Sequence, residues 1–257
     1  MERIDERRRT SFNERAEQYD AARPGYPEAL VRDVLERAGA RRIVEVGAGT
    51  GKATIAFARA GCEIVALEPG PRLVAFLRRK SAGFPDVRVE STTFEAWSVP
   101  DRDFDLVLSA QAFHWVDPAV RYLKAARVAA HLAILTNETA PIDPQLRAAF
   151  DHAYTRWTGP GDGNELAGRA VEIARRTWTE DIDRSGLYGP VDVMTVPWEA
   201  TYTSRDYVAL LETYSDHAAL DAPMRRGLHE AIAGAIDRHG GRIVVPYVAL
   251  AFVARAR

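Results

Sequence analysis

The sequence predicts an α/β protein whose core is a doubly wound sheet of mostly parallel strands. Two observations favour this class: strands and helices alternate along residues 42–136, and several strands are uninterrupted apolar runs, such as 106–108 and 132–135. Strands that helices cover on both faces have this composition. The chain has 257 residues, 47% of them hydrophobic, which is enough for one such domain with an insertion.

The elements of the first half are predicted from apolar patterning, glycine and proline. Pro24 and Pro27 force an extended bend, and the helix that begins at Glu28 ends at Gly39. In chain order we expect helix 11–20, helix 28–38, strand 42–46, helix 50–59, strand 63–67, helix 71–80, strands 87–90 and 104–109, helix 117–127 and strand 132–136.

The second half changes character after Asn137. Helical patterns cover 143–157 and 164–180, and the glycine cluster between them follows no strand, so we interpret it as a turn. We expect Ser204 to cap a helix that follows a predicted strand, and Gly240 and Gly241 to break the chain before the last strand. The remaining elements are expected at strand 191–201, helix 205–215, helix 222–238 and strand 243–253. We expect the insertions 137–186 and 203–239 to lie over the carboxyl edge of the strands, where ligands bind in such folds.

Composition excludes several classes of function. The formal charge is −2, from 34 basic and 36 acidic residues, which gives no reason to expect nucleic acid or a membrane surface as a partner. Cys62 is the only cysteine, so a disulfide framework and a cysteine-rich metal site are not expected, and no metal site is predicted. The first residues lack the apolar core of a signal peptide, and no apolar run reaches the ~20 residues of a membrane helix. These features predict a cytoplasmic protein.

Three alternating glycines follow the strand 42–46 directly. Gly47, Gly49 and Gly51 lack Cβ atoms, so the backbone there can turn tightly and approach a ligand. The next predicted strand ends on an acid, Glu68, which is placed to accept both hydroxyls of a ribose. Together these features predict a nucleoside-binding crevice.

The spacing of these glycines separates three ligand classes. A phosphate-binding loop would need glycine where Val46 stands and a hydroxyl where Ala53 stands. A dinucleotide site would need a third glycine three places after the second, and the carboxylate of Glu45 would repel a pyrophosphate. Glu45 suits a cationic amino group instead. A dinucleotide-dependent reductase is therefore disfavoured, and a strand–turn–helix without any ligand stays open as a further alternative.

The run from Glu45 to Gly51, E-V-G-A-G-T-G, resembles motif I of the class I S-adenosylmethionine-dependent methyltransferases. The resemblance continues through 67–69, 93–95 and 104–109, and through an N-terminal pattern ending in R-P-G-Y-P at 23–27. The segment Q-A-F-H-W at 111–115 is similar to the small-molecule branch that contains trans-aconitate methyltransferase.

The resemblance implies S-adenosyl-L-methionine as cofactor and a seven-stranded Rossmann-like sheet with an antiparallel last strand. It implies one methyltransferase domain over 1–257, with an N-terminal cap at 1–40, a cofactor-binding core at 41–137 and helical lid insertions at about 138–186 and 203–239.

Chemistry and resemblance together assign cofactor roles to individual residues. Glu45 would bind the methionine amino group, Glu68 the ribose hydroxyls, and Arg23 the methionine carboxylate, because a guanidinium pairs with a carboxylate through two bonds. Relatives place an acid for the adenine amino group where this chain has Thr93, which leaves that contact in doubt. The cofactor-binding candidates are Tyr19, Arg23, Glu45, Gly47, Ala48, Gly49, Gly51, Glu68, Pro69, Thr93, Phe94 and Ser109.

The acceptor side is less defined. His114 is a candidate base or hydrogen-bonding residue, or else a packed structural histidine. Further substrate candidates are Trp115, Trp157, Tyr202, Tyr214 and His217. The [DNS]-P-P-[YFW] motif of enzymes that methylate amino groups of nucleic acids is absent at 111–115.

We therefore expect O-, N- or C-methylation of a small, mainly apolar molecule, with a hydroxyl or carboxylate acceptor favoured, by a monomer or homodimer. A non-catalytic, regulatory binder of S-adenosylmethionine is the alternative.

Overall fold

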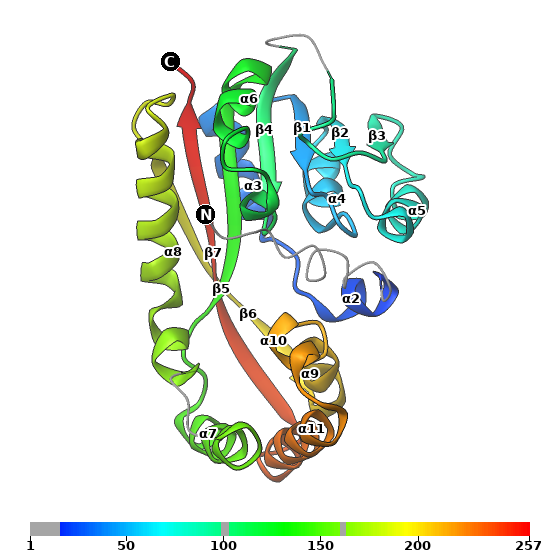
Figure 1. The fold of residues 1–257 in the computed structure, drawn as a ribbon. Coiled ribbons are helices and arrows are strands. Elements are labelled where there is room, and N and C mark those ends of the chain that lie inside the picture. Colours follow the sequence, from blue (N-terminus) through cyan, green and yellow to red (C-terminus); the bar gives the residue numbers. More distant parts are fainter. Residues whose placement is uncertain (1–15, 99–102, 160–162) are drawn as a thin grey trace.

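The computed structural model describes residues 16–98, 103–159 and 163–257, and its centre is one seven-stranded sheet (Figure 1). The strand order is β3-β2-β1-β4-β5-β7-β6. The strands are β1 (Arg42–Val46), β2 (Glu63–Leu67), β3 (Val87–Glu90), β4 (Phe104–Ala110), β5 (Ala129–Thr139), β6 (Asp192–Thr203) and β7 (Arg242–Arg255).

The register confirms a mixed sheet whose last strand is antiparallel. Strands β1 to β5 pair in parallel, as in Val44 with Val65 and Val107, whereas β7 is antiparallel to both β5 and β6. The β6–β7 ribbon is longer than the central strands and extends past their carboxyl ends (Figure 1). It thereby forms a second platform beside the carboxyl edge.

Helices cover both faces of the sheet because alternate strand residues point to opposite sides. Ile43 belongs to a core with α3 (Glu28–Ala38) and α4 (Lys52–Arg59), whereas Val44 belongs to a core with α6 (Arg121–Val128) and α8 (Gly163–Ser185). The helix α5 (Pro71–Lys80) follows β2.

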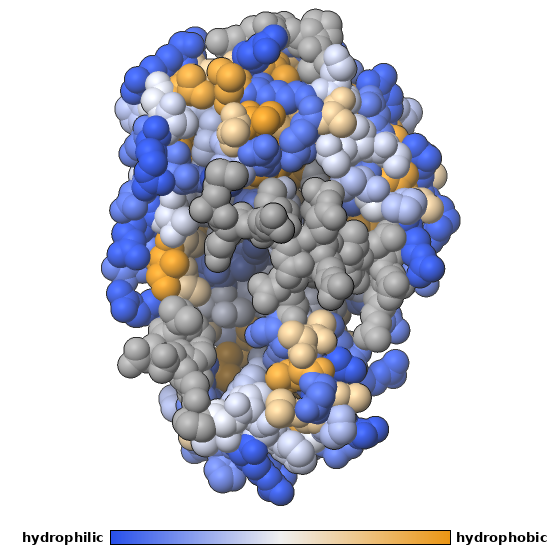
Figure 2. Space-filling model, viewed as in Figure 1, coloured by the Kyte–Doolittle hydropathy of each residue, from blue (hydrophilic) through white to orange (hydrophobic). Residues whose placement is uncertain are grey.

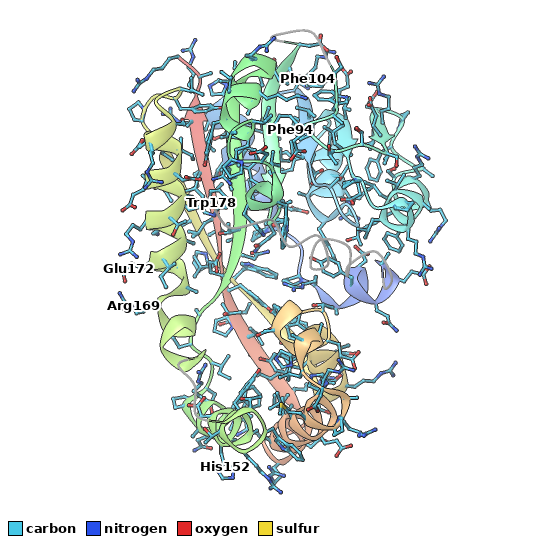
Figure 3. All side chains as sticks on the ribbon, in the orientation of Figure 1. Phe94, Phe104, His152, Arg169, Glu172 and Trp178 are labelled. Carbon is cyan, nitrogen blue, oxygen red and sulfur yellow. The ribbon has the colours of Figure 1, made fainter. Side chains whose placement is uncertain are left out.

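The helix α8 corrects one expectation about the first insertion. It lies along the face of the sheet rather than over the carboxyl edge, because Trp178 and Ile182 pack into the same core as Phe113. Figure 3 shows Trp178 pointing toward the sheet while Arg169 and Glu172 point away from it.

The other insertion helices pack on the β6–β7 ribbon and form a third core. They are α7 (Pro144–Thr158), α9 (Ser204–Leu211), α10 (Ser215–Ala219) and α11 (Ala222–Arg238). The prediction of one helix over 205–215 is wrong: α9 ends at Leu211, the hydroxyl of Thr213 donates to the Leu210 carbonyl at 2.6 Å, and Tyr214 is extended. A side-chain hydroxyl that competes for a helix carbonyl favours such an end.

At the N-terminal side, the helix α2 (Ala16–Ala22) covers the second part of the predicted helix 11–20, and residues 11–15 lie outside the described residues. Hydrophilic residues dominate the face shown in Figure 2, with small separate hydrophobic areas. No helix in the described ranges is long and apolar enough to cross a membrane.

Candidate active site

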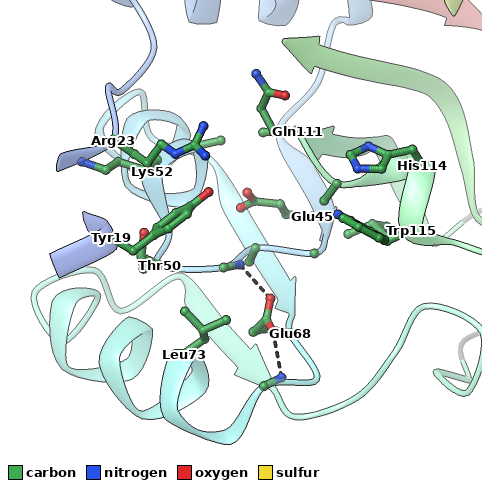
Figure 4. A pocket seen from close by; sticks show the side chains of 18 of the residues that line it. Tyr19, Arg23, Glu45, Thr50, Lys52, Glu68, Leu73, Gln111, His114 and Trp115 are labelled. Carbon is green, nitrogen blue, oxygen red and sulfur yellow. Dashed lines mark hydrogen bonds between the residues drawn. The ribbon is translucent and has the colours of Figure 1, made fainter. Parts of the chain in front are cut away.

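A cavity of about 640 Å³ opens at the carboxyl ends of β1, β2, β4 and β5, between the sheet, α2 and α10 (Figure 4). It brings together most of the residues that the sequence selected. Those in its lining are Tyr19, Arg23, Glu45, Gly47, Ala48, Gly49, Glu68, Pro69, Thr93, Phe94, His114, Trp115 and Tyr214.

The glycine turn packs closely against the segment after β4 at Gly47 but not at Gly49. Gly47 has φ +71°, and a Cβ there would lie 2.5 Å from the Cβ of Ala112. Gly49 has φ +58°, and a Cβ there would meet no atom within 4 Å. Gly47 therefore needs to be glycine for packing, whereas Gly49 leaves open space on the cavity side of the turn.

Gly51 lies outside the cavity lining, although it belongs to the same turn. Its φ is +80°, and a Cβ would lie 2.2 Å from Cδ1 of Leu77 on α5. It therefore lets α4 begin close to α5 rather than facing a ligand.

Glu68 is held by the backbone on both sides. Its Oε2 accepts a hydrogen bond from the Gly49 N–H at 2.8 Å, and its Oε1 accepts one from the Gly70 N–H at 2.7 Å (Figure 4). A carboxylate has about four lone-pair sites, so two backbone bonds do not exhaust its capacity to accept hydrogen bonds. The two backbone bonds orient a buried carboxylate, 6% exposed, for donors such as hydroxyl groups.

Glu45 is the most buried acid of the cavity, at 1% exposed. The hydroxyl of Thr54 donates to its Oε2 at 2.5 Å. Burial raises the pKa of Glu45 to about 8, and repulsion by Glu68 contributes to the shift. A cationic group next to this carboxylate would reverse the shift, so the site fits an ammonium group.

Arg23 joins the two segments that border the cavity opposite the sheet. Its Nε and Nη2 donate to the side-chain and backbone oxygens of Thr213, at 2.8 and 3.1 Å. The guanidinium lies 4.1 Å from the ring centre of Tyr214 and 5.4 Å from that of Tyr19. A carboxylate partner for its remaining N–H groups stays a prediction.

The segment after β4 forms another part of the wall. His114 lies in the short helix η2 (Phe113–Trp115), and its ring centre is 4.6 Å from that of Trp115. Partial desolvation lowers the pKa of His114, and the nearby Arg121 lowers it further. The imidazole is therefore neutral at pH 7 and can accept a proton.

Comparison with known proteins identifies this architecture. Residues 43–133 match the family model of the methyltransferase domain. This segment of the chain is therefore similar to the methyltransferase domain. The matched segment runs from β1 into β5 and therefore contains the glycine turn, Glu68 and the segment after β4.

Curated relatives match this chain over part of their length. An uncharacterized methyltransferase of Mycobacterium tuberculosis is 40% identical over 118 residues, which cover 46% of this chain and 47% of the relative. A malonyl-[acyl-carrier protein] O-methyltransferase of Halorhodospira halophila is 29% identical over 172 residues, which cover 64% of this chain and 52% of that relative. The chain spans about half the length of these relatives.

A solved structure of a candidate type II methyltransferase from Anaeromyxobacter dehalogenans shares the fold over nearly the whole chain. Its TM-score is 0.67 at 24% identity, and the match covers 91% of this chain and 97% of that chain. These comparisons support the class I methyltransferase fold, while the finer resemblance to the trans-aconitate branch stays a prediction.

Besides Gly51, four other proposed site residues lie outside the lining of the cavity. Ser109 is fully buried and donates to the Val46 carbonyl at 2.9 Å, so it joins β4 to β1. Trp157, Tyr202 and His217 contribute to contacts of the helical insertions instead. A Cβ on Gly227 would lie 2.3 Å from the Trp157 ring, which shows how closely that ring packs on α11.

His217 is buried within the insertions and forms hydrogen bonds there. Its Nε2 lies 2.9 Å from the Tyr154 hydroxyl, and its Nδ1 lies 3.0 Å from Nε2 of His229. The helix pattern identified an aromatic, histidine-containing insertion but not the direction of its side chains, because these depend on how α7, α10 and α11 pack.

Other lining residues were not selected from the sequence. Among them are polar residues at the end of β5 and at the start of α10, a tyrosine of β7, and residues beside the predicted motifs: Asn137, Glu138, Thr139, Asp216, Tyr247, Tyr26, Lys52 and Gln111. The sequence could have predicted Asn137, Glu138 and Thr139 as site residues. They come soon after the apolar run 132–135, in a strand whose carboxyl end faces the site. Within the described ranges no group of His, Cys, Asp and Glu could hold a metal ion.

Proposed function

We propose that this chain transfers a methyl group from S-adenosyl-L-methionine to a small molecule. The observation that carries the proposal is the pair of buried carboxylates at the ends of adjacent strands, Glu45 on β1 and Glu68 after β2, with the open side of Gly49 between them. Glu45 would bind the amino group, and Glu68 would bind the ribose hydroxyls. S-adenosylmethionine supplies a methyl group already activated by a sulfonium.

The cavity walls support the orientation of the rest of the cofactor. Pro69, Leu73 and Phe94 offer apolar surface for adenine on the β2 side. Thr93 accepts a hydrogen bond from the Ala96 N–H at 3.2 Å, so its hydroxyl caps a turn at the position where relatives place an acid for the adenine amino group. Arg23 would lie at the methionine end, next to Tyr19.

The protein's main contribution would be alignment of the acceptor with the methyl group. Holding two reactants in line near ~3 Å removes several kcal/mol of the barrier. The lining includes Trp115, Tyr214 and Tyr247, and one cavity of about 640 Å³ must hold cofactor and acceptor together. These features support a small, mainly apolar acceptor with a hydroxyl or carboxylate group.

Isothermal titration calorimetry with S-adenosylhomocysteine and with NAD tests the cofactor. We expect binding of S-adenosylhomocysteine in the micromolar range and no heat from NAD, because the spacing of Gly47, Gly49 and Gly51 does not match a dinucleotide site. Binding of NAD alone would instead support a dinucleotide-dependent reductase. Binding of S-adenosylhomocysteine without turnover of any acceptor would support the non-catalytic, regulatory alternative.

A further inference from the structure

Gln111 has an unusual backbone conformation at the end of β4. Its φ is +58°, the only positive φ of a non-glycine residue among residues 16–98, 103–159 and 163–257. Residues with a Cβ disfavour this left-handed region, and glycine adopts it without strain. The Gln111 N–H donates to the Leu135 carbonyl at 2.9 Å, which fixes the turn. The chain therefore keeps a side chain at a position where glycine would be less strained.

The side-chain amide of Gln111 is only partly used by the protein. Its Nε2 donates to the backbone carbonyl of Asn137 at 3.1 Å. A carbonyl oxygen only accepts, so the NH₂ group and not Oε1 must face Asn137. Oε1 and the second N–H of Nε2 remain for another partner, and Gln111 belongs to the lining of the cavity.

This amide lies on the acceptor side of the cavity. Gln111 projects from the same segment as His114 and Trp115, away from Glu68 and the β2 side (Figure 4). An acceptor group that can both accept and donate a hydrogen bond would suit this part of the cavity. It could accept from the amide N–H of Gln111 and donate to the neutral imidazole of His114. A hydroxyl has both capacities, whereas a carboxylate only accepts.

We propose that Gln111 determines acceptor specificity by binding a hydroxyl group of the acceptor, which rests on the proposed methyltransferase function. The free N–H of Gln111 donates to the hydroxyl oxygen, and the hydroxyl donates to His114. The oxygen then forms a bond to the methyl carbon while the methyl–sulfur bond breaks. Sulfur keeps that electron pair as a neutral thioether, and the hydroxyl proton moves to His114.

The test combines a substrate panel with three variants. Radiolabelled methyl transfer is measured for phenols and for benzoates and anilines with the same ring substituents. We expect transfer to phenols, with kcat/KM about fivefold or more lower in Gln111→Met and Gln111→Gly, the usual effect of one lost hydrogen bond. Gln145→Met, on the exposed face of α7, is the matched control and should keep the activity of the unmodified chain.

Two further measurements separate specificity from structure. The dissociation constant of S-adenosylhomocysteine should stay within about twofold in all variants, and the unfolding midpoint of Gln111→Gly should not fall, because glycine relieves the positive φ. Exclusive methylation of benzoates or anilines, an inactive panel with S-adenosylhomocysteine bound, unchanged kcat/KM in both variants, or a parallel loss of cofactor affinity would each overturn the proposal. If the unmodified chain does not bind S-adenosylhomocysteine, both this proposal and the proposed methyltransferase function are overturned.

Discussion

The carboxylate of Asp20 on α2 lies 2.6 Å from the ammonium of Lys80 on α5, and 3.7 Å from that of Lys52. Lys80 also donates to the Thr50 carbonyl in the glycine turn, at 3.2 Å. The Asp20 and Lys80 side chains are only 19% and 25% exposed. This ion pair attaches the helix that borders the cavity to the segment proposed to bind the cofactor.

Asp20→Asn should therefore loosen α2 and weaken binding of S-adenosylhomocysteine by ~1 kcal/mol or more, since a partly buried ammonium loses its partner. Glu17→Gln is the matched control. Glu17 also lies on α2 and pairs with Arg79 on α5, but its side chain is 79% exposed, and exposed ion pairs contribute little to stability. Calorimetry on the two variants checks this, and equal affinities would contradict it.

Closure of the N-terminal segment is a related expectation. Amides of residues 16–27 should gain protection from hydrogen exchange when S-adenosylhomocysteine binds, because Tyr19 and Arg23 border the cavity, whereas residues 243–253 should change little. The predicted lid also includes 11–15, which lie outside the described residues. Equal protection with and without ligand would rule out a lid.

Glu68→Ala should weaken binding of S-adenosylhomocysteine by ~1.5–3 kcal/mol, the usual size for hydrogen bonds to a charged group. The variant also removes the acceptors of the Gly49 and Gly70 N–H groups, so the loss belongs in the upper part of that range. Glu63→Ala is the control, because Glu63 is the exposed first residue of β2, the strand that precedes Glu68. An unchanged dissociation constant would show that Glu68 does not bind the ribose.

Cofactor binding should release a proton near Glu45. Its pKa of about 8 lies above the ordinary carboxyl value, so the free protein holds a proton there at pH 7. A bound ammonium favours the ionised form, so affinity should rise with pH until about 8. At pH 7, calorimetry in two buffers with different ionisation enthalpies should give different binding heats, and Glu45→Gln should remove that difference. Equal heats for the unmodified protein would contradict the assignment.

His114→Ala should lower kcat by about 10²-fold or more, the range for general base catalysis, while changing cofactor affinity little. The reason is its place in the segment after β4, with a pKa that leaves it neutral at pH 7. Single-turnover methyl transfer and calorimetry separate the two effects. Loss of cofactor binding with normal turnover per bound cofactor would make His114 structural.

The buried histidine pair should make stability depend on pH. Burial lowers the pKa of His217 to about 4, and the facing His229 contributes to this shift, while Asp216 opposes it. Burial likewise lowers the pKa of His229, with Arg225 adding to the shift and Glu212 opposing it. A histidine with a lowered folded-state pKa stabilises above its unfolded value of 6.5 and loses that contribution as pH falls.

Between pH 7 and 5 the unfolding free energy should therefore drop by ~1–2 kcal/mol more in the unmodified protein than in His217→Gln. Urea unfolding at several pH values measures this difference. His152→Gln, on the outer side of α7 (Figure 3), is the control and should keep the pH slope of the unmodified protein. Identical slopes in His217→Gln would contradict the assignment.

The sequence by itself determined the strands of the central sheet, the glycine turn and the position of Glu45 and Glu68 at the strand ends. These features are local, because a strand that runs into Gly47 and Gly49 and then into a helix needs no distant contact to turn there. The apolar runs of β4 and β5 likewise indicated strands buried on both faces, and the parallel sheet then placed their carboxyl ends together.

Only the tertiary structure decided which insertion residues border the cavity. Arg23 contacts Thr213, which is 190 positions away, and Asn137 bonds Gly25, Gln111 and Trp198 from three other segments. Such contacts depend on how the β6–β7 ribbon carries α9, α10 and α11 past the edge of the sheet. Aromatic residues of the insertions can face either a neighbouring helix or the cavity, and packing placed Trp157 against α11, whereas Tyr214 borders the cavity.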